Sequence, residues 1–520
     1  MTEYIVEQLS IADLENGVSR RAAQILHWVN LVSGQFYKER PEQFRRDQRA
    51  DQTLLDNLDF VRTRLRDSGL TNDDVCHDLL ARIVFVQFLF DRKDSSGYAA
   101  LNAGKLERLY EEGVLRGRHD SFASILSNYR ETYRFFYWLD ERFNGDLFPG
   151  RNHTGLAREQ AWQAEKHDVN QSHLEILSDL VSGNLHLPTG QRLLWRDYSF
   201  DAIPLEFVSS ILEAFVKDRA RTSGIYFTPP HLVDFTLDQV LPWGGEQWDL
   251  KVLDPACGSG VFLVKAFQRL VHRWKNAHPD DVIRTETLRG LLENNLFGVD
   301  KDPHAVRVAS YNLYLAMCDE IDPRYYWSQV RFPLMRDRRL IHADFFREDQ
   351  SGFQTHLDAG TYDLVVGNAP WGEKSLTREA KDWADEHGWP PAYKGIGTMF
   401  LPKAAALTKR TGKVAIIQSA SSLLFNRSGP ATEFRKRLFT TLRIEQVVNL
   451  SALRFKVFKK KKNSAQKTIA PSCVVVFSPQ PPDGSRLLYV SPKVVQSKTN
   501  EIDVKIEAKD VKEIFPEEAA

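Results

Sequence analysis

Hydrophobic and polar residues follow different patterns in the first two hundred residues and in the rest of the chain. Early in the chain, residues 75–90 are apolar on nearly all sides, which predicts a buried helix, and residues 71–74 before it resemble a capping box. Aromatic-rich helical patterns continue at 129–143 and 174–187, whereas strand patterns are few. We therefore expect an all-helical domain over residues 1–201.

After residue 201, short apolar runs alternate with helical patterns, which is typical of an α/β domain with a parallel sheet. The runs predict buried strands at residues 251–254, 296–300, 340–344, 363–368, 444–450 and 472–477. Ligands of such sheets bind at the carboxyl ends of the strands. The residues that end each run are therefore the candidates for a functional site.

A glycine-rich turn, Asp-Pro-Ala-Cys-Gly-Ser-Gly, follows the first strand at residues 254–260. Gly258 and Gly260 allow a ligand to approach the backbone closely, and the helix after them presents free N–H groups. The turn matches neither the dinucleotide fingerprint nor a P-loop. Asp254 suits a ligand with an amino group or a positive charge better than a phosphate.

Two further strands also end in an aspartate. Asp300 stands where this kind of fold binds ribose hydroxyls. Asp344 can accept a hydrogen bond from an adenine amino group, and the neighbouring Phe345 can cover the ring. The alternative for each aspartate is a helix N-cap, which is favoured for any one of them alone. Three in succession are harder to explain in that way.

The fourth strand ends in Asn-Ala-Pro-Trp, at residues 368–371. The Asn368 oxygen and the Ala369 carbonyl can accept hydrogen bonds from one amino group. Pro370 stiffens the turn, and Trp371 offers a flat face for stacking a base. This combination suits a planar ring with an exocyclic amine. The alternative is an ordinary turn after a strand, and the segment alone does not decide between them.

A fourth kind of segment, Phe-Thr-Pro at residues 227–229, precedes all of these. Locally it favours a capped helix, with Thr228 as N-cap and Pro229 in the first turn. The order of the segments is more specific than any one of them. From residue 224 to residue 477 the chain resembles the gamma-class N6-adenine DNA methyltransferases, especially the modification methylases of Type I and Type IIG restriction systems and related phage-defence systems.

The resemblance implies a Rossmann-like, S-adenosylmethionine-dependent methyltransferase domain over residues 202–480, with the helical domain before it and an extension at 481–520. Cofactor contacts are implied for Phe227, Thr228, Asp254, Ala256, Gly258, Gly260, Asp300, Asp344 and Phe345. A flipped adenine of double-stranded DNA would be held by Asn368, Ala369, Pro370 and Trp371. The family usually has proline where this chain has Ala369, which keeps the carbonyl and loses rigidity.

A basic run lies between the last two predicted strands. The family has an aromatic-containing motif in this region, so we expect contacts to DNA there. The candidates are Phe455, Phe458, Lys459, Lys460, Lys461 and Lys462. The alternative is a solvated basic loop.

Composition restricts the picture further. Lysine plus arginine equals aspartate plus glutamate, 69 each, so the total charge neither supports nor refutes DNA binding. The four cysteines form no disulfide pattern, and no apolar run is long enough to span a membrane. We expect a cytoplasmic enzyme without a metal. Residues 481–520 are too few for a target-recognition domain, so a specificity subunit or a longer chain is expected.

Two other functions remain open on sequence grounds. The first is a methyltransferase of RNA adenine or of a protein glutamine, whose motif is similar. The second is a non-catalytic DNA-binding scaffold of a defence complex. The Phe-Thr-Pro segment and the large helical domain disfavour the first, and the presence of Asn368, Asp254 and Asp300 disfavours the second.

Overall fold

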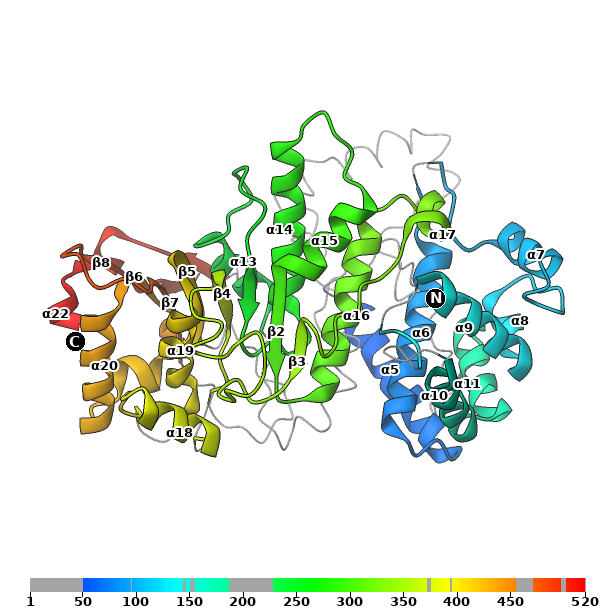
Figure 1. The fold of residues 1–520 in the computed structure, drawn as a ribbon, viewed down its shortest axis with the longest axis horizontal. Coiled ribbons are helices and arrows are strands. Elements are labelled where there is room, and N and C mark those ends of the chain that lie inside the picture. The colour runs from blue at the N-terminus through cyan, green and yellow to red at the C-terminus, as the bar shows by residue number, and fades with distance from the viewer. Residues whose placement is uncertain are drawn as a thin grey trace.

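The computed structural model describes residues 50–94, 96–143, 146–149, 155–186, 228–371, 376–392, 395–454, 471–496 and 502–519. Within this part the chain forms a helical region and a mixed nine-stranded sheet (Figure 1). The calls for Phe227 and for the basic run at 455–462 lie outside the described residues.

The helical region occupies one side of the molecule (Figure 1). Its helices are α5 (Ala50–Asp67), α6 (Asp73–Asp91), α7 (Ala103–Glu111), α8 (Phe122–Leu126), α9 (Tyr129–Phe143), α10 (Gly155–Asp168) and α11 (Gln171–Ser182). The expectation of a buried helix near residues 75–90 is confirmed by α6. Its cap is Asn72, whose side chain accepts from the N–H groups of Asp74 and Val75.

The sheet has the order β11-β8-β6-β7-β5-β4-β1-β2-β3. Its strands are β1 (Val252–Asp254), β2 (Leu296–Asp300), β3 (Leu340–His342), β4 (Tyr362–Asn368), β5 (Thr408–Ser419), β6 (Arg443–Asn449), β7 (Ser472–Ser478), β8 (Leu487–Val490) and β11 (Val511–Ile514). Strands β1 to β5 are parallel, and β7 runs antiparallel between β5 and β6. The order 3-2-1-4-5 reverses between β1 and β4, which makes their carboxyl ends the switch point of a doubly wound sheet.

The last part of the chain adds to this sheet. Strand β8 pairs with β6 in parallel, and β11 pairs with β8 in antiparallel orientation. A separate two-stranded sheet pairs β9 (Lys493–Gln496) with β10 (Ile502–Lys505). The segment that the sequence analysis treats as an extension from residue 481 therefore supplies two strands of the central sheet.

Helices cover both faces of the sheet. Four of them contribute to one core: α13 (Pro230–Asp238), α14 (Val261–Ala277), α15 (Thr285–Asn295) and α16 (Pro303–Asp319). Three contribute to the other: α18 (Arg378–Glu386), α19 (Phe400–Leu407) and α20 (Gly429–Thr441). Side chains of a strand alternate between its faces, so Leu364 and Val366 of β4 join the first core and Val365 joins the second.

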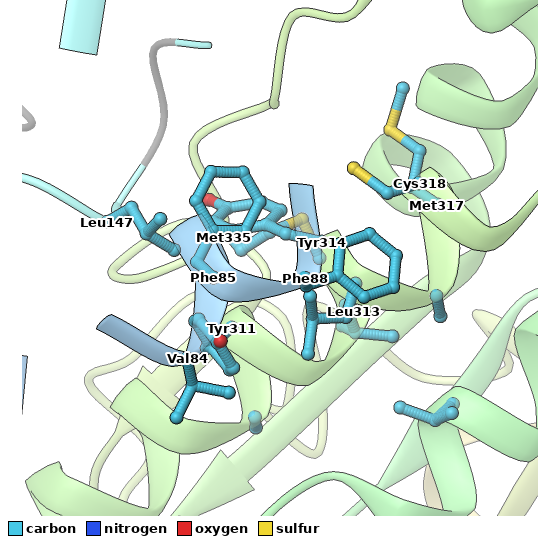
Figure 2. Close-up of a cluster of buried hydrophobic side chains, with 14 of the residues drawn as sticks. Val84, Phe85, Phe88, Leu147, Tyr311, Leu313, Tyr314, Met317, Cys318 and Met335 are labelled. Carbon is cyan, nitrogen blue, oxygen red and sulfur yellow. The ribbon is translucent and has the colours of Figure 1, made fainter. Parts of the chain in front are cut away.

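The helical region packs on the sheet domain through α6 and α16. Figure 2 shows Phe85 and Phe88 of α6 beside Tyr314 and Met317 of α16, all of them at most 1% exposed. A hydrogen bond also joins the two regions, because the Trp327 indole donates to the carbonyl of Ala100 at 2.9 Å. One continuous core thus joins the two regions.

Candidate functional site

Three aspartates end or follow β1, β2 and β3 with the same local geometry. The Oδ1 of each accepts from the backbone N–H two residues later: Asp254 from Ala256 at 3.1 Å, Asp300 from Asp302 at 2.8 Å, and Asp344 from Phe346 at 3.0 Å. None of the three is a helix N-cap, since α14 and α16 begin after Gly260 and Asp302. The capping alternative is therefore wrong for the described structure.

The glycine-rich turn lies between β1 and α14. Gly258 has a φ of +52° and open space where a side chain would stand, as close approach of a ligand requires. Gly260 has a φ of +82°, but a Cβ there would lie 2.9 Å from the Cβ of Ala309. The second glycine is therefore needed for packing against α16, whatever its role in binding.

Asp254 is buried beside β4. A Cβ on Gly367 would lie 2.6 Å from its Oδ1, so the carboxylate occupies the space that a side chain would take next to Asn368. Burial, with a smaller contribution from Asp300, raises the pKa of Asp254 to about 8. A buried acid with a raised pKa and one backbone donor is suited to pair with a cation.

Asp300 connects β2 to the glycine-rich turn. Its Oδ2 accepts from the Gly258 N–H at 2.9 Å, while its Oδ1 accepts from Asp302. Burial raises its pKa as well. Each carboxylate oxygen has two lone pairs, so hydroxyl donors of a sugar can still bind there.

Asp344 and Phe345 lie next along the same edge. The Asp344 Oδ2 pairs with the Lys301 ammonium at 3.0 Å. Phe345 is 2% exposed, and its ring stacks on Phe400 with a centroid distance of 5.2 Å. Its ring therefore stacks in the core of this structure, and a role in covering a cofactor ring stays a prediction.

Asn368 is held at both ends of its amide. Its Nδ2 donates to the Thr228 hydroxyl at 2.8 Å, and its Oδ1 accepts from the Trp371 indole N–H at 2.6 Å. Pro229 is the N-cap of α13 and makes no side-chain cap bond, so the expectation that Thr228 caps this helix is wrong. The Thr228 hydroxyl instead links the Phe-Thr-Pro segment to the end of β4.

The rest of the turn after Asn368 is tightly packed. Ala369 is 1% exposed, yet no described residue donates a hydrogen bond to its carbonyl. The backbone of Gly397 packs on Pro370, because a Cβ there would lie 2.6 Å from the Pro370 oxygen. Trp371 is 7% exposed, and its role in stacking on a base stays a prediction.

The structure thus brings together the described candidates from five separate segments: Thr228, Asp254, Gly258, Asp300, Asp344 and Asn368. Sequence reasoning did not single out Gly367, Lys301 or Gly397. A glycine directly before Asn368, in a strand that is otherwise apolar, was the available signal for Gly367. Lys301 and Gly397 act through contacts with distant residues, for which the sequence holds no local signal.

Two proteins named as methyltransferases are similar to this chain in sequence. The chain is 29% identical over 274 residues to the adenine-specific methyltransferase PglX of Streptomyces coelicolor, covering 46% of this chain and 22% of PglX. It is 21% identical over 316 residues to the Type I restriction enzyme EcoEI methylase subunit of Escherichia coli, covering 60% of this chain and 56% of that subunit. The chain therefore spans about a fifth and about half of the lengths of these two relatives.

The fold has a counterpart among solved structures. The Type IIL restriction-modification enzyme MmeI, solved in complex with DNA, superposes with a TM-score of 0.52 at 14% identity, over 88% of this chain and 60% of MmeI. The model of the N-6 DNA methylase family matches residues 206–514. This match covers more than half of the chain and all of its central sheet, and it shows that the chain belongs to the N-6 DNA methylase family.

Proposed function

We propose that this chain transfers a methyl group from S-adenosylmethionine to the N6 amine of adenine in DNA. The observation that supports this best is the position of Asn368. It ends β4 at the switch point of the sheet, directly after the glycine that faces the buried Asp254 carboxylate. A buried carboxyl group suited to a cation and an acceptor suited to an amine therefore lie next to each other.

The residues fit the cofactor. S-adenosylmethionine carries a positively charged amine, for which Asp254 is the acceptor in this proposal, and a ribose, for which Asp300 is the acceptor. The open side of Gly258 leaves room for close approach. Asp344 and the backbone near Ala256 complete the proposed contacts, and the other proposed members are Phe227, Thr228, Gly260 and Phe345. When bound, the cofactor supplies an electrophilic methyl group.

The chain's own residues would act on the target amine. The lone pair of adenine N6 is delocalised into the ring, so the amine is a poor nucleophile. The Asn368 oxygen and the Ala369 carbonyl would accept hydrogen bonds from its two N–H groups and favour a more tetrahedral nitrogen with a localised lone pair. The step is an in-line displacement that depends on positioning, and it uses no metal in this proposal. Among the described residues, no cluster of ligands could hold one.

The substrate and partners follow from the same chemistry. The target adenine must leave the double helix, because its amine is inaccessible within a duplex. We propose that the basic run at Lys459–Lys462, with Phe455 and Phe458, contacts that DNA. A specificity subunit, or further sequence, would read the base edges within a restriction-modification or phage-defence system. In the described part of the chain, every helix is too short or too polar to cross a membrane, and we propose a cytoplasmic location.

Nucleoside mass spectrometry tests the reaction. Genomic DNA from cells that express the chain, alone and with a candidate specificity subunit, is digested and analysed for N6-methyladenine. We expect the modified base with the wild type and none with Asn368→Ala, which removes one acceptor and leaves the cofactor pocket intact. Methylated RNA or methylated protein glutamine, with unmodified DNA, would instead support the alternative substrates.

A further inference from the structure

The amide orientation of Asn368 is set by its neighbour three residues later. An indole N–H is a donor only, so the atom that faces it at 2.6 Å must be the Asn368 oxygen. The Thr228 hydroxyl receives the Asn368 N–H from the other side. Both hydrogen bonds must break if the side-chain amide is to rotate by half a turn.

This orientation matters for an amine substrate. An adenine N6 amine donates, so it needs the oxygen of Asn368 and is repelled by the NH₂ group. The oxygen has two lone pairs, of which the Trp371 indole uses one. The second lone pair remains for a substrate donor. A freely rotating amide would present the wrong end for part of the time.

The packing of Trp371 points in the same direction. Its side chain belongs to the hydrophobic core of the sheet domain and is 7% exposed. Its N–H has a defined partner in the Asn368 oxygen. Thr228, likewise 7% exposed, is not used to cap α13. The Trp371 indole N–H, as donor, and the Thr228 hydroxyl, as acceptor, therefore both serve Asn368.

We propose that Trp371 is a positioning residue that acts through its indole N–H, and that Thr228 assists it by holding the other end of the Asn368 amide. Together they fix the Asn368 oxygen towards the target amine. This inference rests on the proposed methyl transfer. It is separate from any stacking of the ring on the base, because it assigns an effect to one hydrogen bond.

Two substitutions separate these roles. Trp371→Phe keeps an aromatic ring and removes the N–H. Replacement of Trp371 by β-(benzothien-3-yl)alanine keeps the bicyclic shape as well and exchanges the N–H for sulfur, so it remains informative if the phenylalanine variant folds poorly. We expect each to lower the single-turnover methylation rate by about tenfold to a hundredfold, with the KM for DNA and cofactor affinity within about threefold. Trp243→Phe makes the same chemical change at an indole that is 42% exposed, and serves as the control.

The hydrogen bond between Thr228 and the Asn368 amide can be tested in the same way. Thr228→Val removes the acceptor and should lower the rate, and Thr228→Ser should restore most of it. In an Asn368→Asp background both side-chain oxygens accept, so rotation has no consequence and Trp371→Phe should cost much less. A benzothienyl variant with the rate of the wild type would overturn the proposal. Failure of the wild-type chain, with its partner, to methylate any DNA would instead refute the proposed function.

Discussion

Two buried aspartates show how differently this molecule uses its polar groups. Asp146 lies where the helical region meets the sheet domain, and its Oδ2 accepts from the Tyr314 hydroxyl at 2.8 Å and from two backbone N–H groups at 3.0 and 2.9 Å. Asp254 lies at the switch point of the sheet. Its carboxylate accepts one backbone N–H, and burial raises its pKa to about 8.

The difference separates structural from binding chemistry. At the interface the donors are supplied by the fold, so the carboxylate stabilises the contact between the two regions. At the switch point the fold buries a carboxylate and supplies few donors. Such a site carries a desolvation cost that a cationic ligand can relieve.

The largest expected effect is on stability at the interface. Asp146→Ala leaves a tyrosine hydroxyl and two backbone N–H groups without their acceptor in a buried site. We expect the free energy of unfolding to fall by about 3 kcal/mol or more. Chemical denaturation followed by circular dichroism measures this. A loss below about 1 kcal/mol would show that the interface does not depend on Asp146.

The opposite result is expected at the switch point. Asp254→Asn keeps the shape and removes an acid whose pKa is raised by burial, which costs stability at neutral pH, so the free energy of unfolding should stay the same or rise. Affinity for S-adenosylmethionine should fall by about a hundredfold, because a neutral amide no longer pairs with the cofactor amine. Calorimetry and denaturation of the same preparation measure both. If Asp254→Asn lowered the free energy of unfolding and left the affinity unchanged, Asp254 would have a structural role like that of Asp146.

The affinity for S-adenosylmethionine should depend on pH, because Asp254 gains or loses a proton near neutral pH. With a pKa of about 8 the carboxyl group of the empty protein is mostly protonated at neutral pH, and it must lose that proton to pair with a cation. Affinity should therefore rise as the pH is raised from 6 to 8, by up to about tenfold per unit, and fall above that as the cofactor amine loses its charge. Calorimetry in buffers of different ionisation enthalpy would detect the released proton. In Asp254→Asn the rise should disappear.

The smallest effect is expected at Ala369. Its carbonyl is the proposed second acceptor, and proline would retain that carbonyl while stiffening the turn. Ala369→Pro should therefore keep the methylation rate within about threefold of the wild type. Steady-state methylation assays check this. A loss of activity comparable with that of Asn368→Ala would mean that the turn has to move during the reaction.

Much of the architecture was readable from the sequence, because buried strands and amphipathic helices leave periodic patterns. The helix at Tyr129–Phe143 begins and ends where its pattern predicted. The strand that ends in Asn368 was found in the same way. The joining of β8 and β11 to the central sheet was not foreseen, because short, weakly alternating strands do not reveal their partners.

The site was predictable in its members but not in its contacts. Local patterns marked Asp254 and Asn368, since each ends a buried strand. They could not show that the Thr228 hydroxyl binds Asn368, because 140 residues separate the two in the chain. They also could not show that the Trp371 indole N–H donates to Asn368, because side-chain hydrogen bonds leave no periodic pattern. Tertiary packing decides such points.

Calorimetric titration of the folded chain with S-adenosylmethionine tests the central claim most directly. We expect the wild type and Asn368→Ala to bind with similar affinity, and Asp300→Ala to bind far more weakly. Of the two substituted residues, Asp300 is proposed to contact the cofactor and Asn368 the target adenine. The titration should be repeated with a candidate specificity subunit present. Absence of binding by the folded wild type in both conditions, or equal binding by Asp300→Ala, would contradict the account.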